Sequence, residues 1–387
     1  MHSVSVKLPS STGTTMAGTI DFPDAEPVGF AIFAHCFTCS RFAPAASRVC
    51  KTLAEHGIAA LRFDFPGLGQ SGGEFSDTTF SQNVDDIVAA ATWLGENYRA
   101  PQLIVGHSLG GAAALKAATR DEMQAHLKAV VTIGSPFDPA HCVHHFADRI
   151  SEIKTSGSAT VTLGSQELTL TREYLLDLSG NSPAEYLPQL RTPLLLLHSP
   201  SDATVGIDNA EAIFAATHYP KSLIALDNAD HLLTQPESAQ RTADLIVTWA
   251  RQHLASEFTP EPTTETNAIS YSARGTRFGD IVRTSDRAIV TDRAMSSGGK
   301  GQGVTPTGLF MSALAASTSQ AVREAGRSMG LVDVRVEVTH LGGTDFTREI
   351  TVSGTLGDDQ RAALLAAATA SPIDAFSTGC SFQTTLR

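Results

Sequence analysis

The chain has 387 residues, with 28 basic and 40 acidic side chains and a formal net charge of −12. This length exceeds what one hydrophobic core usually serves, so we expect two domains. The negative charge repels phosphate backbones and anionic lipids, which argues against nucleic-acid and membrane partners. The sequence shows neither a signal peptide nor a run of about 18 apolar residues, and we predict a cytoplasmic protein. Five scattered cysteines favour free thiols over a disulfide framework.

Apolar, β-branched segments bounded by turn residues recur along the first half of the chain and predict strands. They lie at 29–35, 57–65, 101–107, 127–136 and 192–200. Helical patterns fill the intervals, for example at 45–56 and 80–97. Continuously apolar strands that alternate with helices belong to parallel sheets covered on both faces. We therefore expect an α/β fold over residues 1–255.

Residues 137–192 interrupt this alternation. Within them, segments 159–163 and 167–171 alternate apolar and polar residues around a glycine-containing turn, which predicts a β-hairpin. A helical stretch precedes the hairpin and another follows it. Because the segment falls between two strands of the sheet, it predicts an insertion that forms a small lid.

The sequence IVGHSLGG (104–111) contains the pattern G-x-S-x-G, with Ser108 at its centre. An apolar strand is predicted before it and a helix of small residues after it, the context in which this pattern marks a nucleophilic serine. Gly106 and Gly110 suit a strained turn packed closely against its neighbours. The turn would raise the Ser108 hydroxyl above the sheet, at the N-terminus of the following helix.

A serine hydroxyl needs a base to take its proton, and the base needs an acid to orient it. His231 follows the last predicted strand on a polar loop and is the candidate base. Asp202 lies just beyond the carboxyl end of a predicted strand and is the candidate acid. Asp138, after the preceding strand, is the rival acid. Asp230 adjoins His231 and is not expected to reach back to its ring.

An oxyanion requires two preset N–H donors. The backbone N–H of Leu109, directly after the nucleophile, is the first candidate. The second should come from the loop after strand 29–35, where Phe37 N–H is preferred and Cys36 N–H is the alternative.

These motifs resemble the α/β-hydrolase family over residues 1–255. The resemblance rests on five segments in order, which are AHCF, RFDFPGLGQSGG, GHSLGG, SPSDATV and ADHLL. It implies a hydrolase whose catalytic residues follow one another along the chain in the order Ser108, Asp202, His231.

Other reactive-looking motifs lack the context for chemistry. Ser71 also sits in a G-x-S-x-G pattern, but no helix follows it, so a turn residue is expected. The C-x-x-C at 36–39 has no second pair to complete a zinc site, and structural or incidental thiols are favoured. The glycine-rich segment 296–303 lacks a preceding strand and a Ser or Thr after Lys300, which argues against a phosphate loop.

A histidine cluster falls within the predicted lid, with Cys142 among His141, His144 and His145. On a helix, His141 and His145 would share a face and could bind a metal. No carboxylate or third ligand follows at matching spacing, so pocket lining or plain surface is the favoured interpretation. No metal and no cofactor is expected.

Residues 256–268 are rich in Pro, Thr and Glu and predict an exposed linker. Residues 269–387 then predict a separate α+β domain. It contains a long Ala-rich helix from 307 to about 329, strands at 332–340 and 348–356, and a helix at 358–370.

The segments GGKGQGVTPTGLFMSALAASTSQAVR and VDVRVEVTH resemble the OsmC/Ohr family of thiol peroxidases, whose members form intertwined dimers. The whole chain therefore resembles a bifunctional α/β-hydrolase/OsmC protein. The resemblance implies two reactive cysteines, but the matching positions hold Ser317 and Ser371. An alcohol is far less acidic and less oxidisable than a thiolate. Cys380 is nine residues beyond Ser371, the wrong place for a resolving partner. A dimerisation module or binding pocket is the remaining expectation.

The sequence thus predicts a carboxylesterase that acts on a small-molecule ester through an acyl-Ser108 intermediate. Short or aromatic acyl groups are favoured because the lid is small. The C-terminal domain is predicted to make the protein a homodimer. The alternatives are a thioesterase or acyltransferase with the same triad, a non-catalytic binding protein, and an organic hydroperoxide reductase, which the two serines disfavour.

Overall fold

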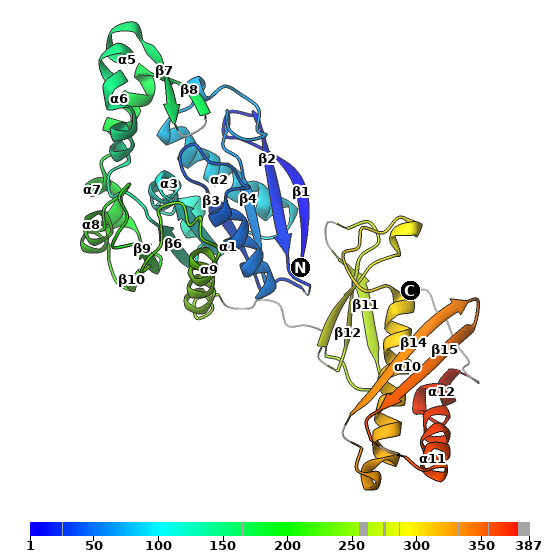
Figure 1. The fold of residues 1–387 in the computed structure, drawn as a ribbon. Coiled ribbons are helices and arrows are strands. Elements are labelled where there is room, and N and C mark those ends of the chain that lie inside the picture. The colour runs from blue at the N-terminus through cyan, green and yellow to red at the C-terminus, as the bar shows by residue number, and fades with distance from the viewer. Residues whose placement is uncertain are drawn as a thin grey trace. The chain divides into compact units, whose positions relative to one another are not determined.

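The computed structural model describes residues 1–24, 26–163, 166–254, 262–273, 276–285, 287–331, 333–354 and 356–377. The chain divides into two compact units (Figure 1). The first comprises Met1–Ile269 with Arg283–Ala288, and the second comprises Ser270–Val282 with Ile289–Arg387. The first part of the predicted linker, residues 256–261, lies outside the described residues. None of the described helices combines the length and apolar character needed to cross a bilayer.

The first unit is built on an eight-stranded sheet. In spatial order its strands are β1 (His2–Pro9), β2 (Thr15–Phe22), β4 (Ile58–Phe63), β3 (Gly29–Ala34), β5 (Leu103–His107), β6 (Ala129–Ile133), β9 (Leu194–His198) and β10 (Lys221–Ala225). β1 and β2 pair antiparallel, as do β2 and β4, and the other neighbours pair parallel. The mostly parallel sheet expected from the sequence is therefore confirmed.

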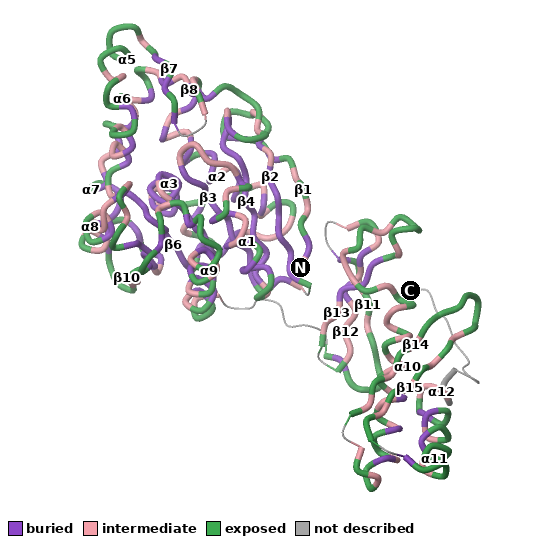
Figure 2. Tube along the Cα trace, viewed as in Figure 1, coloured by how far each residue is buried: buried purple, intermediate pink, exposed green. Residues whose placement is uncertain are grey.

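Helices cover both faces of this sheet, which is why its central strands are buried throughout (Figure 2). Successive side chains of a strand point to opposite faces. In β3, Phe30 and Ile32 enter one core and Ala31 and Phe33 enter the other. The first core is shared with α2 (Phe80–Asn97), α3 (Leu109–Ala117) and α8 (Asp208–Ala216), and the second with α1 (Pro44–Glu55) and α9 (Pro236–Ala250). Two short helices, η1 (Phe75–Asp77) and α4 (Asp121–Gln124), complete the connections.

The predicted insertion between β6 and β9 folds as a small substructure of its own. Its elements are η2 (Pro139–Arg149), α5 (Ile150–Ser156), β7 (Ser158–Leu163), β8 (Gln166–Thr171), α6 (Arg172–Gly180), α7 (Pro183–Tyr186) and η3 (Leu187–Gln189). β7 and β8 form the expected antiparallel hairpin, whose turn at 164–165 lies outside the described residues. Apolar side chains such as Phe146, Ile153 and Leu178 join the insertion to the α2 and α3 side of the core.

The second unit contains two separate groups of strands, of which the β14–β15 pair is antiparallel. They are β11 (Ala268–Ser272), β12 (Asp280–Thr284) and β13 (Arg287–Thr291) in one sheet, and β14 (Val334–Gly342) with β15 (Asp345–Val352) in the other. The helical elements are η4 (Met295–Ser297), α10 (Pro306–Ala325), η5 (Arg327–Met329), α11 (Asp358–Thr369) and α12 (Pro372–Ser377). α10 ends four residues before the predicted end, because Gly326 breaks it and a separate turn follows.

Candidate active site

Ser108 lies in a sharp turn between β5 and α3. Its backbone has φ 55° and ψ −127°, a conformation that costs a non-glycine residue about 1–3 kcal/mol. The turn is possible because its neighbours lack side chains. A Cβ on Gly106 would lie 2.5 Å from the Gly110 carbonyl oxygen, and one on Gly110 would lie 2.2 Å from the His35 oxygen. The local sequence therefore holds the Ser108 hydroxyl in a strained position at the carboxyl end of the sheet.

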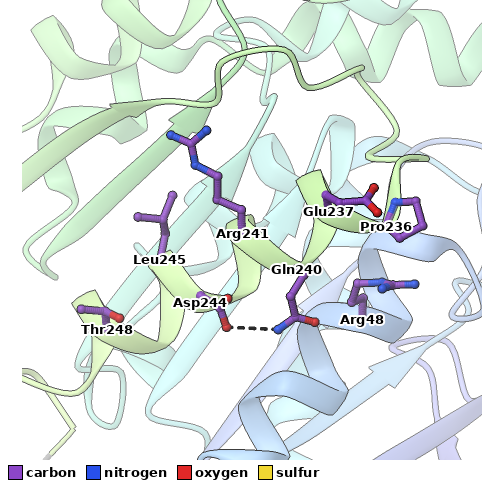
Figure 3. A pocket seen from close by; sticks show the side chains of 8 residues that line it. All are labelled: Arg48, Pro236, Glu237, Gln240, Arg241, Asp244, Leu245 and Thr248. Carbon is purple, nitrogen blue, oxygen red and sulfur yellow. Dashed lines mark hydrogen bonds between the residues drawn. The ribbon is translucent and has the colours of Figure 1, made fainter.

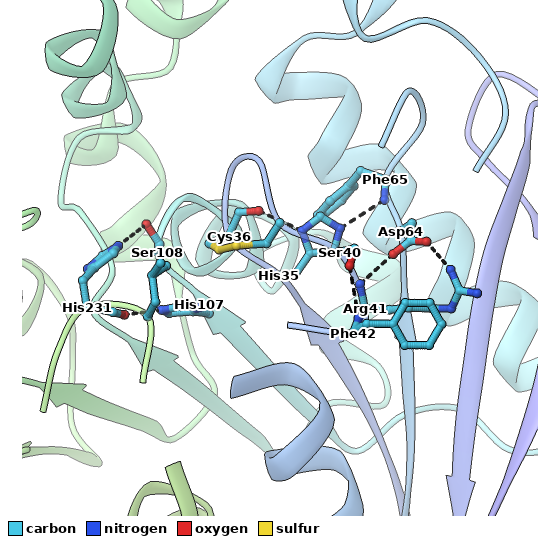
Figure 4. The surroundings of a disulfide bond; sticks show 12 residues. His35, Cys36, Ser40, Arg41, Phe42, Asp64, Phe65, His107, Ser108 and His231 are labelled. Atoms are coloured by element: carbon cyan, nitrogen blue, oxygen red, sulfur yellow. Dashed lines mark hydrogen bonds and ion pairs between the residues drawn. A yellow bond between two sulfur atoms is a disulfide. The ribbon is translucent and has the colours of Figure 1, made fainter. Parts of the chain in front are cut away.

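A continuous chain of hydrogen bonds joins Ser108 to two side chains from later strand ends. Figure 4 shows its first member, the bond between Ser108 and His231. The Ser108 hydroxyl donates to His231 Nε2 at 2.9 Å, and His231 Nδ1–H donates to Asp202 Oδ2 at 2.7 Å. Asp202 follows β9 and His231 follows β10, two neighbouring parallel strands. The side chains of Asp202 and His231 are only 2% and 10% exposed. Such an arrangement lets an imidazole take the proton of an attacking hydroxyl.

The Asp202 carboxylate is fixed by backbone groups as well as by His231. Its Oδ1 accepts the N–H of Thr204 at 2.8 Å and that of Val205 at 3.0 Å. Burial acts to raise the pKa of Asp202, but the hydrogen bonds from His231 and the two amides outweigh it and hold the pKa below its ordinary value. The carboxylate is therefore charged near neutral pH and can stabilise a protonated imidazole next to it.

His107, which sequence reasoning did not single out, supports the loop that carries His231. Its Nε2–H donates to the His231 carbonyl oxygen at 2.7 Å. Burial, followed by the nearby His231, lowers the pKa of His107 to about 4, so the ring is neutral near pH 7. The only signal in the sequence was its position directly before Ser108.

The loop after β3 carries the predicted donor Phe37, and α3 begins at the other predicted donor, Leu109. Neither N–H donates to another residue in the described part of the chain, so both are available to an incoming oxygen. The loop is anchored by His35, whose anchoring role the sequence did not reveal. His35 Nδ1–H donates to the Cys36 carbonyl oxygen at 2.8 Å, and Nε2 accepts the N–H of Phe65 at 3.3 Å. Burial lowers the pKa of His35, which suits this neutral form.

The rival acids have other partners. The Asp138 carboxylate caps η2 by accepting the Ala140 N–H at 2.8 Å. Asp230 accepts the N–H groups of Leu232 and Thr234 within its own turn. Neither is found hydrogen-bonded to the His231 ring, whose Nδ1 is taken by Asp202. Ser71 is a turn residue whose hydroxyl donates to the Asp64 carbonyl oxygen at 2.6 Å.

The expectation of free thiols was wrong for two of the five cysteines. Cys36 and Cys39 form a disulfide within the loop that carries Phe37. Their Cα atoms lie 5.3 Å apart because the chain turns between them, a separation that a disulfide spans readily. Cys50 and Cys142 are free and buried, and Cys380 lies outside the described residues.

The histidine cluster of the insertion contacts the same region without forming a metal site. His141 Nε2–H donates to the Thr204 carbonyl oxygen at 3.0 Å, close to the Asp202 loop. Its ring lies 5.1 Å from that of His144. Burial and then the neighbouring histidines lower the pKa of His145. Throughout the described ranges, no group of three or more His, Cys, Asp or Glu side chains is arranged to hold a metal ion.

A hollow of about 610 Å³ lies along α9 next to α1, away from Ser108 (Figure 3). Its lining consists of Arg48, Pro236, Glu237, Gln240, Arg241, Asp244, Leu245 and Thr248. Ser108, His231 and Asp202 are not part of it. Its lining carries charged groups of both signs but no nucleophile paired with a general base, so we assign it no catalytic role.

Comparisons with known proteins support the fold of the first unit. The family described as serine aminopeptidase, S33, matches residues 34–172. The esterase domain of a Rhodothermus marinus protein is 38% identical, with a TM-score of 0.54, over 66% of this chain and 100% of that domain. A search of curated proteins finds no match.

Two more distant structures share the fold. Est1E from Butyrivibrio proteoclasticus, solved with ferulic acid, is 19% identical over 65% of this chain and 99% of its own, with a TM-score of 0.54. Mouse alpha/beta hydrolase domain-containing protein 10 is 20% identical over 64% of this chain and 98% of its own, with a TM-score of 0.54. The chain, through its first unit, belongs to the α/β-hydrolase superfamily and is a hydrolase.

Proposed function

We propose that the protein is a serine carboxylesterase in which Ser108 is the nucleophile, His231 the general base and Asp202 the orienting acid. The observation that carries this proposal is the unbroken hydrogen-bond chain from the Ser108 hydroxyl through His231 to the buried Asp202. The 38% identity to an esterase domain along that domain's whole length supports the ester class of substrate.

The reaction proceeds in two halves. Ser108 Oγ attacks the ester carbonyl while His231 Nε2 takes its proton, and the N–H groups of Phe37 and Leu109 bind the resulting oxyanion. His231 then returns the proton to the leaving alcohol, which leaves an acyl group on Ser108. Water, activated by the same imidazole, releases the acid and restores the serine.

The acyl groups proposed are short or aromatic. Next to the oxyanion loop, the Phe37 ring stacks on Tyr174 of the insertion at 5.8 Å and meets the Phe75 ring edge-on at 5.7 Å. The small pocket that this loop lines contains Phe37, Phe65 and Phe75 but little free volume. A long acyl chain would require these aromatic groups to separate, whereas a short or flat one requires a smaller displacement.

A panel of matched substrates tests the proposal. Each acyl group, acetyl to octanoyl and benzoyl, is offered as an oxygen ester and as a thioester. Aminoacyl arylamides are assayed alongside, and Ser108→Ala is the control. We expect the highest kcat/KM for oxygen esters of short or aromatic acids, with all turnover lost in Ser108→Ala. A preference for the thioester identifies the alternative thioesterase. Turnover of the arylamides alone would identify the peptidase class that the matching family model describes.

For the second unit we propose an OsmC-like fold that dimerises and performs no peroxide chemistry. Ser371, which stands where the resemblance implies a reactive cysteine, is buried and donates its hydroxyl to Asp374 at 2.6 Å. The apolar cluster between α10, α11 and the β14–β15 pair is small, with Val322, Leu356, Leu364 and Ala368 as its buried members. Large apolar side chains remain exposed, among them Met295, Leu341 and Leu365 at 75%, 65% and 62%. A second copy of the unit would cover such surface.

We propose a cytoplasmic location for the whole protein.

A further inference from the structure

The loop that carries Phe37 is held at both ends by groups on the segment after β4 (Figure 4). At its start, His35 Nε2 accepts the Phe65 N–H. At its end, the Arg41 N–H donates to Asp64 Oδ1 at 2.6 Å, and the Arg41 guanidinium forms an ion pair with the same carboxylate. Asp64 is fully buried, so this anchor is shielded from water. The backbone segment between residues 36 and 40 is therefore the part of the loop that these anchors do not hold.

The Cys36–Cys39 disulfide bridges this segment. It closes the turn that contains Phe37, together with a hydrogen bond from the Cys39 N–H to the Cys36 carbonyl oxygen at 3.1 Å. Cys36 is 5% exposed and packs beside the pocket that Phe37 and Leu109 line, whereas Cys39 is partly exposed. A donor displaced by about 1 Å no longer fits the oxyanion, and the disulfide restricts how far Phe37 N–H can move.

The other described thiols cannot exchange with this pair. Only a thiolate attacks a disulfide. Cys50 is completely buried, and burial raises its pKa well above the ordinary value. Burial raises the pKa of Cys142 to about 12. Reduction and oxidation of the Cys36–Cys39 pair therefore require a reagent from solution, which reaches Cys39 first.

We propose that Cys36–Cys39 is a reversible redox-modification site that controls the oxyanion hole, with the disulfide as the active form. This inference rests on the proposed esterase function. In the cytoplasm, where we propose that the protein resides, the disulfides that form are mostly transient and redox-sensing. The pair closes a short loop, which constrains little of the unfolded chain, so the reduced protein retains its fold.

The exchange is balanced with a small dithiol as the reductant. One thiolate of the dithiol attacks Cys39 Sγ, a mixed disulfide forms, and Cys36 leaves as a thiolate that takes up a proton. The second thiol of the reagent then attacks the reagent's other sulfur, the one bonded to Cys39 Sγ, and the Cys39 thiol is released. The protein pair gains two electrons and two protons, and the dithiol becomes a cyclic disulfide.

The test compares the full-length enzyme in reduced and oxidised dithiothreitol. Alkylation with N-ethylmaleimide, followed by peptide mapping, reports whether Cys36 and Cys39 are free. Ester hydrolysis and the rate of fluorophosphonate labelling of Ser108 report the state of the site. We expect both thiols to become alkylated on reduction, and kcat to fall by about tenfold or more with little change in KM, because full loss of an oxyanion donor costs about 10²–10³. Reoxidation should restore kcat.

Two variants provide the controls. Cys36→Ser/Cys39→Ser should have the low kcat of the reduced wild type and be insensitive to dithiothreitol. Cys50→Ala, which keeps the pair, should respond as the wild type does. The inference is overturned if the pair resists reduction in the folded enzyme, or if the reduced enzyme or the double serine variant keeps kcat within twofold of the oxidised wild type. An enzyme with neither hydrolysis nor labelling in either redox state overturns the proposed function itself, and this inference with it.

Discussion

The Asp202 carboxylate accepts hydrogen bonds from His231 and from two backbone amides, whereas that of Asp138 caps its own helix. Asp202→Asn replaces the charge with an amide that cannot stabilise a protonated imidazole and can select the wrong tautomer. We expect kcat/KM to fall by about 10³–10⁴-fold, the scale seen when a triad acid becomes an amide. Asp138→Asn, the matched control, should change it little. A larger loss in Asp138→Asn than in Asp202→Asn would show that the acid is assigned to the wrong strand.

The protonation of His107 makes the free energy of unfolding depend on pH. Its folded pKa of about 4 lies below the 6.5 of a free histidine, so between these values the unfolded chain binds the proton more readily than the folded protein. This contribution to stability is therefore complete above pH 6.5 and is lost as the pH falls toward 4. At 1.36 kcal/mol per pKa unit, the loss is about 3 kcal/mol. His107→Asn keeps an N–H donor for the His231 carbonyl but does not titrate.

Urea unfolding at pH 7 and at pH 4.5 measures this difference. The free energy of unfolding should fall more for the wild type than for His107→Asn over that interval. Titratable groups that do not interact with His107 titrate equally in both proteins and cancel in the comparison. Equal losses would mean that His107 is already charged, or is solvated, in the folded protein.

Ser108, His231 and Asp202 could be predicted because their signals are local: a motif, a chain order and a place after a strand. The supporting roles of His107 and His35 could not be predicted, because both side chains bond to backbone groups, those of His231 and Phe65, that only the tertiary fold brings to them. The Cys36–Cys39 disulfide was missed because the count and scatter of cysteines say nothing about a loop that brings two of them together.

At the scale of elements, the close packing of α3 against the loop after β3 positions both proposed oxyanion donors. Gly110→Ala would place a Cβ within 2.5 Å of the carbonyl oxygens of Ala34 and His35, which are backbone atoms that cannot turn aside. We expect a loss of about 1–3 kcal/mol in unfolding free energy, the cost of overpacking, and at least a tenfold loss of kcat.

Gly95→Ala in α2 is the matched control. Its Cβ would lie at an ordinary 3.6 Å from Ala100, and alanine in a helix is more stable than glycine by about 0.5–1 kcal/mol. Thermal unfolding and esterase assays of the two variants provide the comparison. If Gly110→Ala is as stable and active as Gly95→Ala, α3 does not depend on this close approach.

The elements of the first unit were predictable because strand and helix patterns alternate cleanly there. α2 has its predicted limits, and the expected strands lie within the predicted segments. The second unit was harder to predict. Only Leu314, Thr318 and Val322 of α10 are buried, in a single stripe, so the helix pattern alone did not reveal what covers its other faces.

At the scale of the whole molecule, the proposed dimer makes the second unit necessary for assembly. A chain of 40.8 kDa should scatter light as twice that mass at micromolar concentration, with an interface on the order of 2,000 Å². A chain ending at residue 264 should be monomeric and keep its esterase activity. A monomeric full-length protein, or a truncated chain that still dimerises, would contradict the assembly role.

The central claim is that Ser108 is an activated nucleophile, and the site of fluorophosphonate attachment tests it most directly. The native enzyme is treated with the reagent, digested, and the adduct located by mass spectrometry, with Ser108→Ala and His231→Ala alongside. We predict one adduct per chain, on Ser108, with none on Ser71, Ser317 or Ser371. It should be absent from Ser108→Ala and formed at least about 10³-fold more slowly in His231→Ala. An adduct on another serine, or equal labelling without His231, would contradict the account.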